Sequence, residues 1–334
     1  MSGISGRRGL VRAGRLMVVV TTLATVTFTG YGWYLRREVA ASVTHLRSDV
    51  FAGMENRPEG VRISVAAAPP KTVLLLGSDI RLGSDAGGGV TGQRADTILI
   101  AHLPQGHHRA EVLSVPRDSW VEIPGHGMAK INASLAYGGV PLTIRTVEAV
   151  TGIRIDHVVV VDFAAVRDLT TALGGVAVDN PAASTDPLTR TTFDAGRLVL
   201  QGDRALTFVR QRYGLPGGDI DRITRQHVLL SAVGRQIAAR ALTDGALREK
   251  VLGVVRRNVS TDSGLDDDTF LTLFFDIATL PSGSVSFHTA PVAGSGTSAD
   301  GQAYLELDRD RLAAVAEALR AGEPIPLPLT ITPS

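Results

Sequence analysis

The sequence of 334 residues contains no cysteine, few aromatic residues and, among its 34 basic residues, only three lysines, at 71, 130 and 250. The absence of cysteine excludes disulfide bonds and thiolate chemistry. A chain of this length buries a core large enough to fold without disulfide bonds. No spacing of histidine and acidic residues typical of a zinc site occurs, and no Gly-x-Ser-x-Gly motif of a serine hydrolase.

Charge is also absent from residues 16–35, which are rich in Val, Leu, Ala and Thr. At about 1.5 Å per residue, this segment crosses a hydrocarbon core of about 30 Å. A cleaved signal peptide has an apolar region of only about 7 to 15 residues. Ala40 and Ala41 nevertheless keep a cleavage site as the alternative. We therefore expect one uncleaved transmembrane helix.

Arginines flank this segment unequally. Four arginines precede it, in residues 7–15, and two follow it, Arg36 and Arg37. The positive-inside rule then places the tail 1–15 in the cytoplasm and the remainder of the chain outside the cell membrane. Six of the 34 basic residues lie in residues 1–37, so 28 remain against 33 acidic ones in the exported part. A domain of net negative charge is a poor candidate for nucleic-acid binding.

Residues 36–70 turn from a mixed pattern to Gly, Pro and Ala, which predicts a stalk and linker before a domain over 71–325. In that domain, short apolar and β-branched runs alternate with segments of helical periodicity. This alternation predicts an α/β fold with a central mixed β-sheet flanked by helices. The expected strands are 73–77, 97–103, 111–115, 157–161 and 285–288, and the expected helices are 143–150, 163–173, 219–242, 247–257, 268–278 and 308–321.

Charged residues gather where the predicted strands end and where the long helix at 219 begins. Asp79 follows the first strand, and Asp96 precedes the second. Loop-borne sites are commonly built at strand ends. Guanidinium groups bind phosphate oxygens in a bidentate manner, and aspartate oxygens suit Mg²⁺ or Mn²⁺. We expect six arginines to converge there around an anionic ligand: Arg94, Arg117, Arg210, Arg212, Arg222 and Arg225.

Six segments in this order resemble the LytR-CpsA-Psr family of cell-wall glycopolymer phosphotransferases. They are Leu76-Gly77-Ser78-Asp79, Arg94-Ala95-Asp96-Thr97, Ser114-Val115-Pro116-Arg117-Asp118, Lys130-Ile131-Asn132-Ala133 with Tyr137-Gly138-Gly139, Asp162-Phe163 with Leu173-Gly174-Gly175-Val176, and residues 200–226. Together with the following helix they cover residues 71–239, half of the chain. Two departures are the Gly-rich loop 83–92, between the two aspartates, and Asp221 in place of a small residue.

The resemblance implies transfer of a glycopolymer, such as a teichoic acid, from a polyprenyl-pyrophosphate carrier to peptidoglycan in a Gram-positive cell wall. Asp79 and Asp96 would hold Mg²⁺, or Mn²⁺. Asp219 would orient or deprotonate the acceptor hydroxyl, or simply cap its helix, with Arg117 and Arg212 beside it as catalytic residues. The expected pyrophosphate-binding residues are Arg94, Arg117, Lys130, Asn132, Arg210, Arg212, Arg222, Arg225 and Gln226.

The lipid end of such a carrier requires an apolar cavity, for which residues 158–161 or Leu229, Leu230, Val233 and Ile237 are candidates, although core packing explains them equally. Two other functions remain open. The same groups could hydrolyse polyprenyl pyrophosphates with water as the acceptor. Alternatively, the protein could be a membrane-bound regulator or lipid-binding module without enzymatic activity.

Overall fold

The computed structural model describes the part of the chain that follows the expected transmembrane segment, with gaps. Residues 16–35, the loop 83–92, Asp79 and Arg94 lie outside the described residues. None of the helices in the described part has the length and apolar character needed to cross a membrane. The described residues are 44–46, 49–61, 69–78, 95–240, 243–266, 269–270, 273, 276–277, 280–281 and 283–328.

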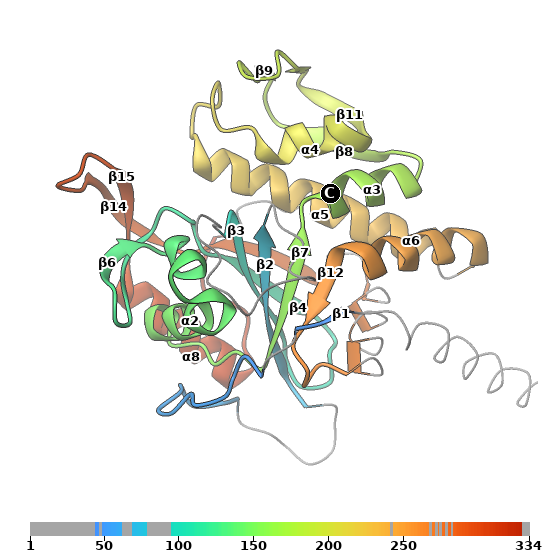
Figure 1. Ribbon diagram of the computed structural model, residues 1–334. Helices are drawn as coiled ribbons and strands as arrows, with labels where there is room; N and C mark the ends of the chain where they lie inside the picture. The colour runs from blue at the N-terminus through green and yellow to red at the C-terminus, as the bar shows by residue number, and fades with distance from the viewer. Residues whose placement is uncertain are drawn as a thin grey trace, which may run out of the picture. The chain divides into compact units, whose positions relative to one another are not determined.

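A mixed sheet forms the centre of the domain (Figure 1). In the described part it has seven strands, in the order β1-β12-β7-β2-β3-β4-β13. The pairs β2–β7, β4–β13 and β1–β12 are parallel, and the remaining pairs are antiparallel. The strands are β1 (Thr44–His45), β2 (Lys71–Ser78), β3 (Thr97–Leu103), β4 (Ala110–Ser114), β7 (His157–Asp162), β12 (Val259–Thr261) and β13 (Val285–Thr289).

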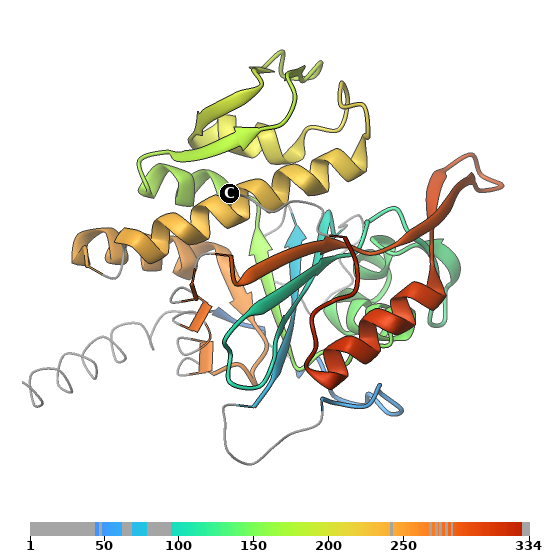
Figure 2. The same ribbon diagram turned by 180° about the vertical axis from the view of Figure 1, so that it is seen from behind.

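Two helices, α2 (Ala133–Thr151) and α8 (Arg309–Ala321), cover one face of this sheet (Figure 2). Their apolar residues share one core with the alternating side chains Leu74 and Leu76 of β2, which are fully buried. Alternation places such residues on a single face of a strand, so the pattern fixes which side of β2 meets the helices.

A second core lies beyond the strand ends, where β2, β4 and β7 finish and β3 begins. It joins four helices to the hairpin β8–β11, and Phe193 and Phe208 pack edge to face in its centre, with ring centroids 5.2 Å apart. Figure 1 shows α3, α4, α5, β8 and β11 above the upper end of the sheet and α6 beside it. They are α3 (Ala164–Ala172), α4 (Gly202–Arg210), α5 (Asp219–Arg240), α6 (Gly245–Asn258), β8 (Val176–Asn180) and β11 (Gly196–Leu200).

Three further two-stranded sheets complete the described part: β5–β6 (Trp120–Ile123, Gly127–Lys130), β9–β10 (Ser184–Thr185, Thr192–Phe193) and β14–β15 (Val292–Thr297, Ala303–Leu307). The backbone N–H of Leu305 in β15 donates to the carbonyl of Asp118, 3.0 Å away. The β14–β15 hairpin is therefore fastened to the segment that follows β4.

The predicted central elements are confirmed, including β3 over residues 97–103 and the helix beginning at Asp219. Helix α2 starts ten residues before the predicted 143, because Gly138, Gly139 and Pro141 read as a break in the sequence. The backbone is non-helical at both glycines, so α2 consists of two helical stretches joined at a kink. The predicted helix 268–278 falls largely outside the described residues.

The expected linker 36–70 requires a correction. Residues 44–45 form β1 in the main sheet, and Leu46 and Val50 are buried in the core under α2 and α8. Arg57 makes an ion pair of 2.6 Å with the buried Glu148 of α2. The folded unit therefore includes residues 44–46 and 49–61. The apolar residues of this segment are scattered among polar ones and follow neither the period of a strand nor that of a helix, so their pattern does not predict burial.

Candidate functional site

Seven charged side chains meet where β3 begins, where β4 has just ended and where α5 starts. We call them the ionic cluster. They come from five separate segments, because the strand ends and the first turn of α5 face one another. The members are Asp96, Arg117, Asp118, Lys130, Arg212, Asp219 and Arg222.

Arg117 lies in the middle of this cluster and is 11% exposed. Its Nη1 pairs with Oδ1 of Asp96, and its Nε lies 3.6 Å from Oδ1 of Asp219 and 3.8 Å from Oδ2 of Asp118. Pro116 restricts the backbone immediately before it, and the carbonyl of Arg117 accepts a hydrogen bond of 3.2 Å from the backbone N–H of Asn132. The arginine is thus held in place at both ends.

Asp219, in the first turn of α5, is surrounded by three guanidinium groups. Its Oδ1 lies 3.0 Å from Nη2 of Arg222, 3.5 Å from Nε of Arg212 and 3.6 Å from Nε of Arg117. Its carboxylate is therefore directed at the cluster. Arg222 also donates to the backbone carbonyl of Asp96 at 3.1 Å, which ties α5 to the start of β3.

Among the described residues of the cluster, three buried polar atoms form no hydrogen bond: Nε of Arg117, Nε of Arg222 and Oδ1 of Asp219. Oδ1 of Asp219 is nevertheless in ion-pair contact with the arginines. A buried polar atom without a hydrogen bond typically costs about 1–3 kcal/mol, and such atoms in native structures often belong to a functional site. Two cationic donors are therefore available for an anion at this position.

Asp118 connects two further cations to the cluster. Its Oδ1 lies 3.1 Å from Nζ of Lys130, and its Oδ2 accepts from Nη2 of Arg212 at 3.4 Å. The four cations and three anions leave an excess of one positive charge among the described side chains. Burial lowers the pKa of Arg222 to about 10, with Asp219 opposing the shift, so Arg222 remains protonated at neutral pH.

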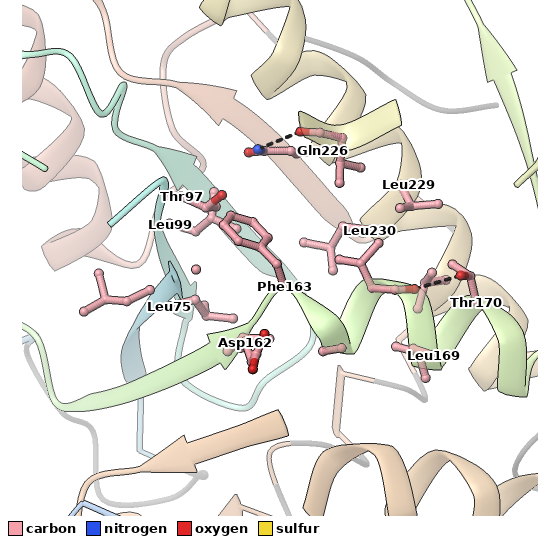
Figure 3. A pocket seen from close by; sticks show the side chains of 17 residues that line it. Leu75, Thr97, Leu99, Asp162, Phe163, Leu169, Thr170, Gln226, Leu229 and Leu230 are labelled. Atoms are coloured by element: carbon pink, nitrogen blue, oxygen red, sulfur yellow. Dashed lines mark hydrogen bonds between the residues drawn. The ribbon is translucent and has the colours of Figure 1, made fainter. Parts of the chain in front are cut away.

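An apolar cavity of about 190 Å³ adjoins the cluster (Figure 3). Leu75 and Leu99 of the sheet, Phe163 and Leu169 beside α3, and Leu230 of α5 line it. A side chain at Gly77 would place its Cβ 2.9 Å from the Cβ of Thr97, so this wall of the cavity requires glycine. Thr97, next to Asp96, and Gln226, one turn after Arg222, also line the cavity, which places it beside the cluster.

Comparison with known proteins assigns the chain. The model of the LytR_cpsA_psr family matches residues 43–321. The chain belongs to this LytR-CpsA-Psr family. The match extends well beyond the six motifs in both directions, and it begins where the described fold begins.

Relatives and solved structures of LytR-CpsA-Psr proteins agree over most of the chain. It is 29% identical over 317 residues to the polyisoprenyl-teichoic acid–peptidoglycan teichoic acid transferase TagU of Halalkalibacterium halodurans, covering 94% of this chain and 98% of TagU. TagV of Bacillus subtilis superimposes with a TM-score of 0.62 at 27% identity, covering 76% and 97% of the two chains. TagT bound to LI-WTA does so with a TM-score of 0.61 at 27% identity, covering 84% and 98%.

Not every residue that the LytR-CpsA-Psr resemblance or the charge pattern singled out lies in the cluster. Arg225 is turned away from it and is buried in the second core. Its Nη1 donates to Oε1 of Gln211 and its Nη2 to Oγ of Ser184, both at 2.6 Å, and its guanidinium lies 4.4 Å from the ring centroid of Phe208. The expectation that Arg225 joins the converging arginines is therefore corrected. Arg225 follows Asp219 by six residues, so the helix rotates it about 120° away from Asp219 around the helix axis.

Three other predicted residues, Gln226, Arg210 and Asn132, make contacts beside the cluster. Gln226 lines the apolar cavity and donates to the carbonyl of Val209 at 3.3 Å. The guanidinium of Arg210 lies 5.4 Å from the ring centroid of Phe163, above another wall of that cavity. Asn132 is buried beneath Arg117.

Sequence reasoning missed Asp118 as a member of the site. The signal was its position directly after Arg117, in the motif that ends β4. The sequence also did not decide which apolar residues line the cavity. Leu229, Leu230, Val233 and Val161 do line the cavity, whereas Ile237 packs in the second core.

Asp79 and Arg94 lie outside the described residues, so their predicted roles remain predictions. No group of three or more His, Asp or Glu side chains within the described ranges is arranged to hold a metal ion by itself. Asp96, 22% exposed and paired through one oxygen with Arg117, supplies the hard oxygen chemistry that Mg²⁺ prefers. Mg²⁺ commonly uses one or two carboxylates and completes its shell with phosphate and water, and Asp96 fits that requirement.

Proposed function

We propose that this protein transfers a glycopolymer from a polyprenyl-pyrophosphate carrier to a hydroxyl group of peptidoglycan, forming a phosphodiester. One observation carries the proposal: Arg117 and Arg222 each keep a buried Nε without a hydrogen bond, in a cluster whose chain neighbours Thr97 and Gln226 line an apolar cavity. A polyprenyl pyrophosphate matches this arrangement, because it has an anionic head group for the cationic cluster and an apolar chain for the cavity. The name of the TagU relative gives a polyisoprenyl-linked teichoic acid as the donor and peptidoglycan as the acceptor.

Each part of the site has a role in this reaction. Arg117, Arg212 and Arg222 bind the pyrophosphate, with Lys130 nearby, and stabilise the charge that builds up on the leaving phosphate. The cavity holds the first part of the prenyl chain. Mg²⁺, held by Asp96 together with Asp79, would neutralise further phosphate charge when bound.

Asp219 acts on the acceptor. The acceptor oxygen attacks the phosphorus atom that carries the glycopolymer and passes its proton to Asp219. The new O–P bond forms as the bond to the lipid-side phosphate oxygen breaks, and polyprenyl phosphate leaves. Arg117, Arg212 and Arg222 hold Asp219 beside the phosphates.

We further propose that residues 16–35 span the cell membrane and that the domain lies outside it. The carrier lipid and the enzyme would then meet within the plane of one membrane, where the cavity can take up the prenyl chain. This topology rests on the length and arginine flanks of the segment.

The test incubates the detergent-solubilised full chain with a polyprenyl-pyrophosphate-linked saccharide, Mg²⁺ and peptidoglycan oligomers. The wild type is compared with Arg212→Ala and Asp96→Ala. Arg235→Ala is the control, because Arg235 is exposed on the same helix and donates to Oγ of Ser231 at 3.0 Å, outside the cluster. Saccharide joined to peptidoglycan by the wild type and the control, but not by the other two variants, supports the transferase.

Other products would identify other functions. Release of phosphorylated saccharide without transfer would make the protein a pyrophosphatase. Tight binding of the carrier without any product would make it a lipid-binding module.

A further inference from the structure

A second hollow lies on the other side of α4 from the apolar cavity. Its volume is about 310 Å³, within the range of small-molecule pockets. Leu206, Thr207 and Arg210 of α4 form one wall, and Arg212 and Tyr213 form another. The turn that joins β9 to β10 closes it.

Helix α4 separates the two cavities. Leu206 and Arg210 are four residues apart and lie on the same face of the helix, toward the hollow. Val209 faces the apolar cavity instead. The hollow and the cavity are thus neighbours that share a wall but differ in chemistry.

Arg212 joins the hollow to the ionic cluster. Its side chain lines the hollow, while its Nη2 donates to Asp118 at 3.4 Å and its Nε lies 3.5 Å from Asp219. A ligand in the hollow therefore meets the same guanidinium as a pyrophosphate in the cluster. Arg210 similarly lines the hollow and lies over Phe163, at the edge of the apolar cavity.

The hollow offers both an aromatic ring and a rigid polar turn. Tyr213 is 60% exposed and Leu188 is 77% exposed, which is unusual for large side chains beside a pocket. The backbone N–H and hydroxyl of Thr189 donate to Oδ2 of Asp186, at 3.1 and 2.6 Å, so the turn is held in one conformation. An amphipathic ring beside polar groups suits a sugar, which has apolar C–H faces and a rim of hydroxyls.

We propose that this hollow binds the sugar directly attached to the pyrophosphate of the donor. The assignment rests on the proposed function. Both spaces border the ionic cluster: Arg212 of the cluster lines the hollow, and Thr97 and Gln226, next to Asp96 and one turn after Arg222, line the apolar cavity. A lipid-linked saccharide has a prenyl chain, a pyrophosphate and a sugar in that order, so one extended ligand would fill the cavity, the cluster and the hollow.

The experiment measures the affinity of the full chain, in detergent, for two probes. One is geranylgeranyl pyrophosphate, and the other is the same lipid pyrophosphate carrying one N-acetylhexosamine. The wild type should bind the sugar-bearing probe about 3- to 10-fold more tightly, the range expected for one aromatic contact. Tyr213→Ala should abolish this difference and leave affinity for the sugar-free probe within about 2-fold, whereas Tyr213→Phe should retain it.

Leu188→Ala is a second variant, because a side chain so exposed contributes little to folding, and it should reduce the difference about 2-fold. Val199→Ala is its control, since Val199 is 64% exposed and lines neither cavity. A difference that persists in Tyr213→Ala overturns the assignment. In the transfer assay, Tyr213→Ala could instead raise only the KM for peptidoglycan oligomers. That result would also overturn the assignment, because it would make the hollow an acceptor site.

Failure of the inference is distinguishable from failure of the proposed function. Equal binding of both probes by the wild type overturns the sugar assignment and leaves the transferase standing. Binding of neither probe overturns the proposed function, and the assignment with it.

Discussion

Ser114 and His227 are joined by a contact of 2.5 Å between Oγ and Nε2, although 113 residues separate them. Ser114 is the last residue of β4, three residues before Arg117, and His227 lies on α5, five residues after Arg222. Both side chains are buried. The contact therefore fixes the distance between the two elements that bring the ionic cluster together.

The pKa of His227 predicts a pH dependence of stability. Burial, with a smaller contribution from His288, lowers its pKa from 6.5 to about 4. Because the unfolded chain binds the proton more readily, stability is full above about pH 6.5 and is lost as the pH falls toward 4. One histidine shifted this far accounts for about 3 kcal/mol. Urea unfolding of the wild type and of His227→Gln, from pH 7.5 to 4, measures the effect.

His102 provides the second arm of that experiment, because burial also lowers its pKa to about 4. Each single variant should reduce the slope of stability against pH, and the double variant should reduce it further. An unchanged slope in all three would contradict the prediction.

Asp219→Asn should separate binding from turnover. Loss of the proton acceptor should lower the rate of transfer about 10²- to 10⁴-fold. Removal of a negative charge among Arg117, Arg212 and Arg222 should leave affinity for the pyrophosphate carrier equal or higher, because the cluster becomes more positive. Calorimetry and a transfer assay on one preparation measure both. Asp221→Asn is the control, since that carboxylate accepts from the backbone N–H of Gly217. Loss of binding together with turnover would assign Asp219 a structural role.

Arg225→Met should destabilise the protein without removing a ligand contact. Oε1 of Gln211 and Oγ of Ser184 lose a buried charged donor, which we expect to cost about 2–4 kcal/mol. The folded variant should bind the carrier within about 3-fold of the wild type, whereas Arg117→Ala should lose about 10- to 100-fold. Thermal unfolding and carrier titration give the two readings. A large loss of affinity with little loss of stability would restore Arg225 to the pyrophosphate site.

Mg²⁺ should bind weakly to the protein alone and more tightly in the presence of a pyrophosphate. The reason is the excess positive charge of the described cluster, which repels a free cation until the phosphates add negative charge. By linkage, Mg²⁺ must raise the affinity for pyrophosphate by the same factor. Titration calorimetry in both orders checks this equality, and Asp96→Ala should reduce the coupling. Tight binding of Mg²⁺ alone would indicate a complete carboxylate site.

Leu230→Gln should weaken binding according to the length of the prenyl chain. Leu230 lines the cavity, is 42% exposed, and can contact a ligand at modest cost to folding. Loss of one apolar contact of this size corresponds to about 1–2 kcal/mol, or about 5- to 30-fold in affinity. Affinity for inorganic pyrophosphate should not change. Val199→Gln, at an exposed site away from the cavity, is the control. An equal effect on both ligands would place Leu230 outside the lipid path.

Much of the chemistry could be predicted from local patterns. An apolar run ended by Gly77 predicts β2, the β-branched run 157–161 predicts β7, and the spacing of Ile223, Val228 and Val233 predicts α5. The strand-end charges and the family motifs predict five site residues that the structure brings together: Arg117, Lys130, Arg212, Asp219 and Arg222. Such patterns report which side chains a strand or helix buries, because the periods of 2 and 3.6 residues are properties of the backbone.

Arg222 and Arg225 show what the sequence alone did not decide. Both follow Asp219 closely and have the same side chain, yet one pairs with Asp219 and the other donates to Gln211 and Ser184. Asp118 and the scattered apolar residues of segment 44–61 likewise acquired their roles only from what packs against them. The sequence determined the elements, the charge at the strand ends and the family motifs. Tertiary packing decided which charges meet, because contacts between residues a hundred positions apart depend on sheet order and on the rotation of α5.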